Sequence, residues 1–250
     1  MDWLTNWMMR EGPGIEKDAP KRTGLPLLGE IVLREAWELF KLNLLIALFC
    51  LPIVTAPAAH AAALRVGASM VRDENVYLWR DFRQAFRAVF ARATIAGFAA
   101  MAVVGLGLYA VFVWGQLALT SPAYAGAAAI CLAATLFALI TACHLMLLIA
   151  TSERPLSRLL PLAAMASLAW PLPMTGALGF VGALWVVHAL FYPVSLFMPA
   201  VANFSLGALV IAFAGLPATT RLLASQAGAP ALRDGNAQDR RFASAPAQDQ

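Results

Sequence analysis

The sequence predicts an all-α, polytopic membrane protein, and its charge distribution and hydropathy carry that prediction. Of the 250 residues, 61% are apolar and 13% are charged, and the mean hydropathy is +0.71. A soluble domain has about 25% charged residues, which it needs to cover its surface. In addition, residues 93–152 and 159–220 contain no Asp, Glu, Lys or Arg. Charge-free tracts of about 60 residues fit a lipid bilayer much better than water.

Four apolar stretches are long enough to cross a bilayer, whose ~30 Å core needs ~20 helical residues. They are residues 93–115, 125–150, about 174–192 and about 200–216. The connectors QLALTSPAY and PVSLFMP, after the first and third stretches, are short, uncharged and contain proline. Such segments are typical of turns at a membrane face. The four spans are therefore expected to form two hairpins.

The arginines predict how these hairpins are oriented. They flank the spans on the side opposite to the uncharged connectors, at Arg80, Arg83, Arg87, Arg92, Arg154, Arg158, Arg221, Arg233, Arg240 and Arg241. Cytoplasmic loops carry an excess of Lys and Arg. We therefore expect the two connectors to face outwards and the C-terminus to be cytoplasmic.

The first apolar segment is interrupted by proline, in the stretch CLPIVTAPAAHAAALRV at residues 50–66. Pro57 removes a backbone donor and disfavours helix at the preceding residue. One interpretation is a kinked span, which puts the N-terminus outside; the other is a re-entrant pair of short helices with both ends cytoplasmic. We favour the kinked span, which gives about five transmembrane helices. The helix break is a candidate site and comprises Pro52, Thr55, Pro57 and His60.

Three regions follow from this pattern. Residues 1–26 form a polar N-terminal segment, residues 27–225 form the helical membrane domain, and residues 226–250 form the tail. The tail is rich in Ala, Gln, Pro, Asp and Arg, so we expect it to be disordered and cytoplasmic.

The segment LWRDFRQAFRAVFAR, residues 78–92, has the pattern of an interfacial helix. On a helical wheel its aromatic residues share one face, and its arginines lie together on one flank. A helix of this kind lies at the cytoplasmic interface and directs its cations to anionic lipid headgroups. The alternative is a helix packed under the bundle with solvated arginines. The candidate interfacial or partner-binding residues are Trp79, Arg80, Asp81, Phe82, Arg83, Phe86 and Arg87.

Two stretches, LNLLIALFCLPIVTAPAAHAA and MVRDENVYLWRDFRQAFRAVFARA, resemble the YesL-like family of small bacterial integral membrane proteins. The resemblance covers roughly residues 12–93. It implies a multi-pass protein of the bacterial inner (plasma) membrane and a place near carbohydrate uptake. ABC sugar-transporter subunits are then candidate partners, besides self-association. It implies no catalytic residues.

Polar groups within the apolar segments are candidates for function, because they are costly in lipid. They are His60, His144, His188, Asn43 and Asn203. We expect the histidines to bind neighbouring backbone carbonyls and hold helices together. No motif of a known enzyme class occurs, so we expect no catalytic residue, metal, cofactor or nucleic-acid partner.

Three functions are compatible with these observations. The favoured one is a non-enzymatic accessory protein that binds a transporter or another membrane protein. The second is a small transporter or permease-like subunit with a site at the Pro52/Pro57 helix break. The third is a membrane enzyme with an unrecognised site.

Overall fold

The structure is a computed structural model and describes residues 22–226. These residues form helices joined by turns, without a β-strand. Four helical segments are long and apolar enough to cross a membrane: residues 78–120, 122–151, 171–190 and 201–226. The predicted all-α polytopic fold with its four spans is confirmed. The N-terminal segment and the tail, both predicted from sequence, lie almost entirely outside the described residues.

The described part of the chain begins with four short helices, and prolines lie at the breaks between the last three of them. These helices are α2 (Leu25–Arg34), α3 (Ala36–Cys50), the 3-10 turn η1 (Ile53–Thr55) and α4 (Ala56–Val71). Pro52 has an extended backbone that ends α3, while Pro57 sits in the first turn of α4, where its missing N–H costs nothing. The Thr55 hydroxyl shares its proton between the carbonyl of Phe49, which the end of α3 leaves free, and that of Pro52, which also accepts the Thr55 amide.

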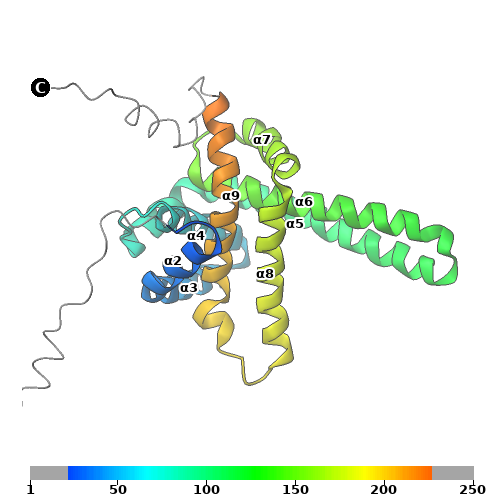
Figure 1. Cartoon of the computed structure of the whole chain (residues 1–250), viewed down its shortest axis with the longest axis horizontal. Coiled ribbons are helices and arrows are strands. Elements are labelled where there is room, and N and C mark those ends of the chain that lie inside the picture. Colours follow the sequence, from blue (N-terminus) through cyan, green and yellow to red (C-terminus); the bar gives the residue numbers. More distant parts are fainter. Residues whose placement is uncertain (1–21, 227–250) are drawn as a thin grey trace, which may run out of the picture.

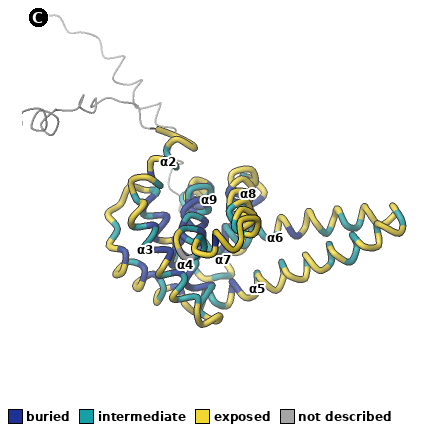
Figure 2. The backbone as a smooth tube through the Cα atoms, turned by 90° about the horizontal axis from the view of Figure 1, so that it is seen from below, coloured by how far each residue is buried: buried dark blue, intermediate teal, exposed yellow. Residues whose placement is uncertain are grey.

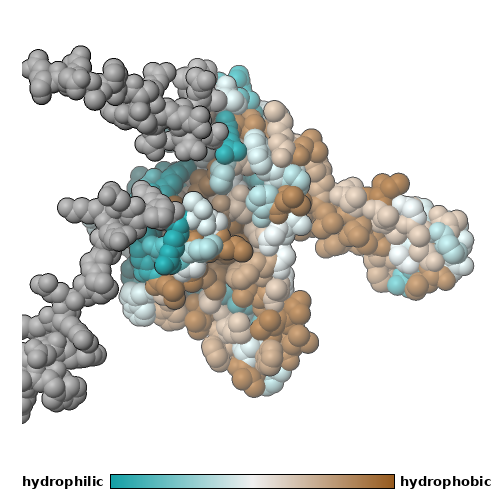
Figure 3. Space-filling view, viewed as in Figure 1, coloured by the Kyte–Doolittle hydropathy of each residue, from teal (hydrophilic) through white to brown (hydrophobic). Residues whose placement is uncertain are grey.

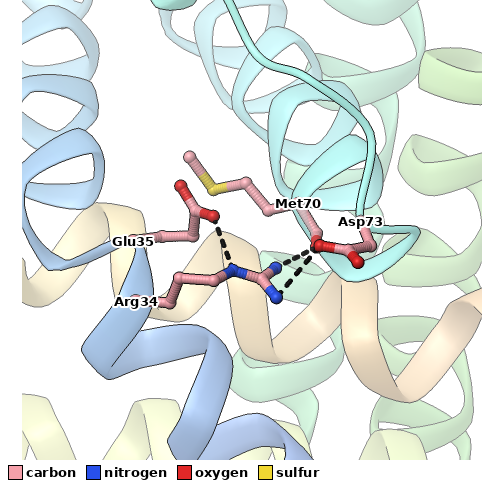
Figure 4. A network of polar contacts seen from close by, with 4 residues as sticks. All are labelled: Arg34, Glu35, Met70 and Asp73. Carbon is pink, nitrogen blue, oxygen red and sulfur yellow. Dashed lines mark hydrogen bonds and ion pairs between the residues drawn. The ribbon is translucent and has the colours of Figure 1, made fainter. Parts of the chain in front are cut away.

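Helices α3 and α4 form an antiparallel hairpin whose open end is closed by Arg34. The guanidinium of Arg34 lies 3.0 Å from the carboxylate of Asp73, just past α4, and 2.9 Å from that of Glu35, just before α3 (Figure 4). It also donates to the carbonyl of Met70. The hydrogen bond to Glu35 and the nearby carboxylate of Asp73 raise the pKa of Arg34, so its guanidinium stays charged at physiological pH.

The turn after α4 uses a left-handed residue. Asp73 has φ of 59°, and the amides of Asp73 and Glu74 donate to the carbonyls of Met70 and Ser69. This is a Schellman cap, in which Asp replaces the usual Gly. The cap ends α4 beside the start of α3, so it holds the hairpin ends together.

The fifth, kinked span expected from sequence is therefore replaced by a re-entrant helix pair. Helices α3 and α4 have 15 and 16 residues, roughly 22 and 24 Å, which is less than the ~30 Å of a bilayer core. Their connecting turn exposes Leu51, Ile53 and Val54, while their open end carries charge. An antiparallel pair with an apolar tip and a charged base fits the second interpretation of the sequence, a re-entrant pair with both ends on one side.

The first long hairpin consists of α5 (Leu78–Thr120), the turn η2 (Pro122–Tyr124) and α6 (Ala125–Thr151). The outer part of this hairpin projects away from the other helices (Figures 1 and 2). Helix α5 has 43 residues, roughly 65 Å, about twice the thickness of a bilayer core. The separate interfacial helix expected at residues 78–92 is instead the first part of α5, continuous with the span.

The second hairpin consists of α8 (Pro171–Leu190) and α9 (Phe204–Gln226), which lie side by side. The short helix α7 (Leu156–Ala169) precedes α8, and the π-helical turn η3 (Pro199–Asn203) leads into α9. The two long hairpins diverge from a shared base (Figure 1).

Helix α4 lies at the centre of this base and contacts α3, α5, α6 and α9. Most of its residues are buried, and six of those are alanine: Ala58, Ala59, Ala61, Ala62, Ala63 and Ala68 (Figure 2). A Cβ on Gly67 would lie only 3.4 Å from the Cα of Leu209, so α4 and α9 nearly touch through their backbones. Small residues allow this approach in membrane proteins, where close packing drives association.

Arginines gather at one end of the bundle, which we name the charged side. There Arg65 of α4 donates to the carbonyl of Ala150, and Arg92 of α5 donates to those of Ser152 and Arg154. The guanidinium of Arg154 binds the side chain of Gln226 at the end of α9. Carbonyls at the end of α6 lack helical partners, so these cations both satisfy them and complement the helix dipole. Hydrophobic residues cover much of the two hairpins away from this side (Figure 3).

The contact between α4 and α5 gives a direct test of this packing. A Cβ on Gly97 would overlap the ring of Pro57, which is rigid, whereas a Cβ on Gly105 meets no atom within 4 Å. We expect Gly97→Ala to lower the free energy of unfolding by about 1–3 kcal/mol. Gly105→Ala is the matched control and should leave stability unchanged or slightly higher, because Ala favours helix. Thermal unfolding in detergent measures both, and equal stability of the two variants would refute the contact.

Candidate functional site

Asn43 of α3 joins the N-terminal hairpin to the start of α9. Its side chain is fully buried, and its Oδ1 accepts hydrogen bonds from the amides of Phe204 (2.9 Å) and Ser205 (3.0 Å). Its Nδ2 donates to the carbonyl of Pro199 at 2.7 Å. The amides of Phe204 and Ser205 lie where the π-helical turn that precedes α9 (Pro199–Asn203) passes directly into α9 and the backbone hydrogen-bond pattern changes. Asn43, about 160 residues away, therefore acts as the cap of α9.

A cavity of about 470 Å³ lies where the two long hairpins diverge. Its floor is the first half of α4 and its walls come from α5, α6, α8 and α9. Many lining residues are small, among them Gly97, Ala100 and Gly207, so the helices leave a space that their side chains do not fill. No Asp, Glu, Lys or Arg lines it. The cavity is thus uncharged and largely apolar.

The four residues of the predicted helix break separate into two groups. Pro57 and His60 line the cavity, and the ring of Pro57 packs on Gly97. Pro52 and Thr55 lie in the turn between α3 and α4 and do not line it. Pro52 thus lies in the turn of the hairpin, whereas Pro57, in the first turn of α4, lines the cavity.

His60 is held by aromatic contact and has no hydrogen-bond partner among the described residues. Its ring meets that of Phe204 edge-on at 5.9 Å, and Phe204 meets Trp185 of α8 in the same way at 5.6 Å. His60 lies deep in the bundle yet remains partly exposed, because it borders the cavity. The prediction that each histidine binds a carbonyl is therefore wrong for His60.

The other two histidines do bind carbonyls. His144 Nδ1 lies 3.1 Å from the carbonyl of Ile140, in its own helix, and 3.2 Å from the hydroxyl of Ser167 in α7. His188 Nδ1 lies 2.9 Å from the carbonyl of Ser195 in the connector after α8. His144 therefore joins α6 to α7, and His188 fixes the turn of the second hairpin.

Asn203 is the polar residue of the cavity wall whose role the sequence could not assign. It is 1% exposed, and neither atom of its amide has a hydrogen-bond partner among the described residues. A buried amide without a partner is costly and rare. Its only sequence signal is that a polar residue occurs in an apolar stretch, a signal that Asn43 shares.

The predicted aromatic–basic residues form the first turns of α5, and the protein covers part of their aromatic face. Phe49 of α3 contacts the rings of Trp79, Phe82 and Phe86 edge-on, at 6.4, 5.3 and 4.9 Å. Phe82 is fully buried. The alternative, packing under the bundle, thus describes Phe82, whereas Trp79 is 55% exposed and keeps the interfacial interpretation open.

The polar residues of the same segment lie outside this contact. Arg80, Arg83 and Arg87 are exposed. The Asp81 carboxylate accepts the amide of Tyr77 at 2.8 Å and the guanidinium of Arg80 at 2.9 Å, so it caps the N-terminus of α5. Within residues 22–226, no group of three or more His, Cys, Asp or Glu side chains is arranged to hold a metal ion.

These features define the class of protein: an all-α polytopic membrane protein with a re-entrant N-terminal hairpin and an uncharged cavity. Within that class, the family model DUF624, described as a protein of unknown function, matches residues 39–111. The match runs from α3 through the hairpin turn and α4 into the span of α5. Comparison with curated proteins and with solved structures found no match.

The capping role of Asn43 predicts a large effect on stability. Asn43→Ala leaves the amides of Phe204 and Ser205 without an acceptor, which costs about 1–3 kcal/mol for each group left unmet. Asn75→Ala removes an exposed amide and is the matched control. We expect a clear fall in the unfolding temperature for Asn43→Ala alone. If the two variants unfolded together, Asn43 would not be the cap.

Proposed function

We propose that the protein is a non-enzymatic accessory of the bacterial inner membrane that binds a carbohydrate-transport protein within the bilayer. The observation that carries this proposal is the projecting α5–α6 hairpin, whose outer half no other part of the described chain covers. Lipid alone can cover such a surface. A helix pair held away from its own bundle, however, is also well placed to pack against the helices of a second protein.

The surface of α6 is suited to such packing. Ala125, Ala129 and Ala133 are exposed and recur at every fourth residue, so they lie on one face of the helix. Small residues at this spacing let transmembrane helices approach closely. The choice of a partner in carbohydrate uptake rests on the resemblance of residues 12–93 to the YesL-like family. The DUF624 match over residues 39–111 names no function and leaves that choice to the experiment.

Co-purification tests this proposal. The tagged full-length chain is co-expressed with the permease subunits of an ABC sugar transporter from the same genome and solubilised in mild detergent. We expect stoichiometric recovery of the permease, and at least a tenfold loss of recovery with Ala129→Leu plus Ala133→Leu, since about 1.4 kcal/mol changes an affinity tenfold. The control is Ala102→Leu, an exposed site on α5. Recovery of a second copy of this chain, or of no permease, would refute the proposal.

The same proposal fixes the orientation, with the charged side in the cytoplasm, because cytoplasmic loops are rich in Arg. In a variant lacking Cys50, Cys131 and Cys143, Leu33→Cys and Asp73→Cys should react with an impermeant maleimide only from the cytoplasmic side. Both positions are exposed. Leu33 comes just before the α3–α4 hairpin in sequence, and Asp73 comes just after it.

Tyr124→Cys, at the tip of the first long hairpin, should react only from outside. Intact cells and inverted vesicles distinguish the two sides. Labelling of Leu33→Cys and Asp73→Cys from opposite sides would mean that α3 and α4 cross the membrane after all.

The alternative, a small transporter with its site at the helix break, has one observation in its favour: Pro57 and His60 line a cavity. The chemistry of that cavity argues against a sugar as its substrate. A sugar presents many hydroxyl groups, and each one buried without a partner is costly. The cavity offers the polar side chains of His60 and Asn203, besides the weak thiol of Cys143, and these cannot match them.

A further inference from the structure

We propose that this cavity binds a neutral, lipid-like molecule with one apolar chain and a hydroxyl or carbonyl head group. The inference concerns a ligand site and goes beyond the accessory role proposed above. It stands on four observations: the volume of the cavity, the absence of charge from its walls, the unpartnered amide of Asn203 and the unpartnered imidazole of His60.

The volume and the walls determine the body of the ligand. A space of about 470 Å³ falls in the range of ligand sites, roughly 300–1,000 Å³. Most lining side chains are aliphatic or aromatic, so they favour an apolar chain. Because no ionised residue lines the cavity, a carboxylate or ammonium would be buried without a counter-charge, at high cost. The ligand is therefore neutral.

Asn203 and His60 determine the head group. The amide of Asn203 has two donors and one acceptor oxygen, and a neutral imidazole has one donor and one acceptor. Neither side chain has a hydrogen-bond partner among the described residues. A hydroxyl or carbonyl bound between them would satisfy both. The amide lies beneath the surface of the wall, so the proposal requires its side chain to rotate toward the cavity when the ligand binds.

The cavity opens toward the bilayer. Met101 of α5 and Trp185 of α8 line its two sides and are 52% and 40% exposed. Both lie on helices that are long and apolar enough to cross a membrane, and the two hairpins to which these helices belong diverge from a shared base (Figure 1). A lipid-like molecule can thus enter sideways from the membrane without passing through water.

Photolabelling of the full chain in lipid nanodiscs tests the inference. The probe is a twelve-carbon alcohol with a diazirine in its chain, and the matched probes are the corresponding alkane and carboxylic acid. Cross-linked peptides are mapped by mass spectrometry. We expect the alcohol to label the cavity segments of α4 and α9, unlabelled dodecanol to compete, and the alkane and the acid to label these segments at least fivefold less.

Four variants show whether the labelling depends on the cavity. His60→Phe and Asn203→Leu each remove one polar partner, which should lower labelling about fivefold for each hydrogen bond lost. Ala100→Leu keeps both polar groups and fills space, so it should also lower labelling. Gly105→Leu lies on α5 outside the cavity and should have no effect.

Thermal unfolding shows whether each variant is folded. If His60→Phe or Asn203→Leu does not fold, Ala100→Leu still tests the cavity. Equal labelling by alcohol and alkane, or labelling that none of the three cavity variants changes, would overturn the proposal. The co-purification experiment tests the surface of the α5–α6 hairpin, not the cavity. Failure to recover the permease would therefore not affect the photolabelling result, and failure of the photolabelling would not affect the co-purification result.

Discussion

Close packing around α4 is the constraint on which the rest of the structure depends. In lipid, helices gain little from burying apolar surface and associate through close contact instead. The alanines of α4, with Gly67, let α3, α5, α6 and α9 all approach one central helix. Gly97 of α5 is needed at the same junction, because it gives room to the ring of Pro57. The same small residues have a second effect. Where the two long hairpins diverge at the start of α4, small residues such as Gly97, Ala100 and Gly207 leave a space that the larger lining side chains border but do not fill, and the cavity results.

The sequence predicts the spans well because lipid imposes a strong and local rule. A helix that crosses a bilayer must be apolar over about 20 residues, so the charge-free tracts at residues 93–152 and 159–220 mark the four spans directly. The prolines correctly locate the break after α3. They do not show whether the chain continues across the membrane or turns back. That outcome depends on tertiary packing, of α3 against α4 and of both against α9, which local pattern cannot predict. The exposed pair of Arg34 with Asp73, 39 positions apart, accompanies this packing.

The segment at residues 78–92 shows a different kind of error. Its aromatic face and its arginines are typical of an interfacial helix, but no Pro or Gly separates it from the span that follows. Unbroken helix propensity therefore predicts one continuous helix, as the structure shows, and this signal was present in the sequence. What the sequence could not contain is the covering of the aromatic face by Phe49, since an aromatic face suits a lipid interface and a protein interface equally well.

Two asparagines show how far the candidate site could be predicted. Both stand out as polar residues in apolar stretches, so the sequence alone cannot assign them different roles. Tertiary structure separates them: Asn43 satisfies three backbone groups at the start of α9, whereas Asn203, in the wall of the cavity, satisfies none. They are also connected, because Phe204, whose amide binds Asn43, directly follows Asn203. The cap thereby fixes the backbone from which the Asn203 side chain projects. A ligand that turns this side chain toward the cavity pulls on a helix end that α3 holds in place, so the re-entrant hairpin supplies the rigid support for the proposed site.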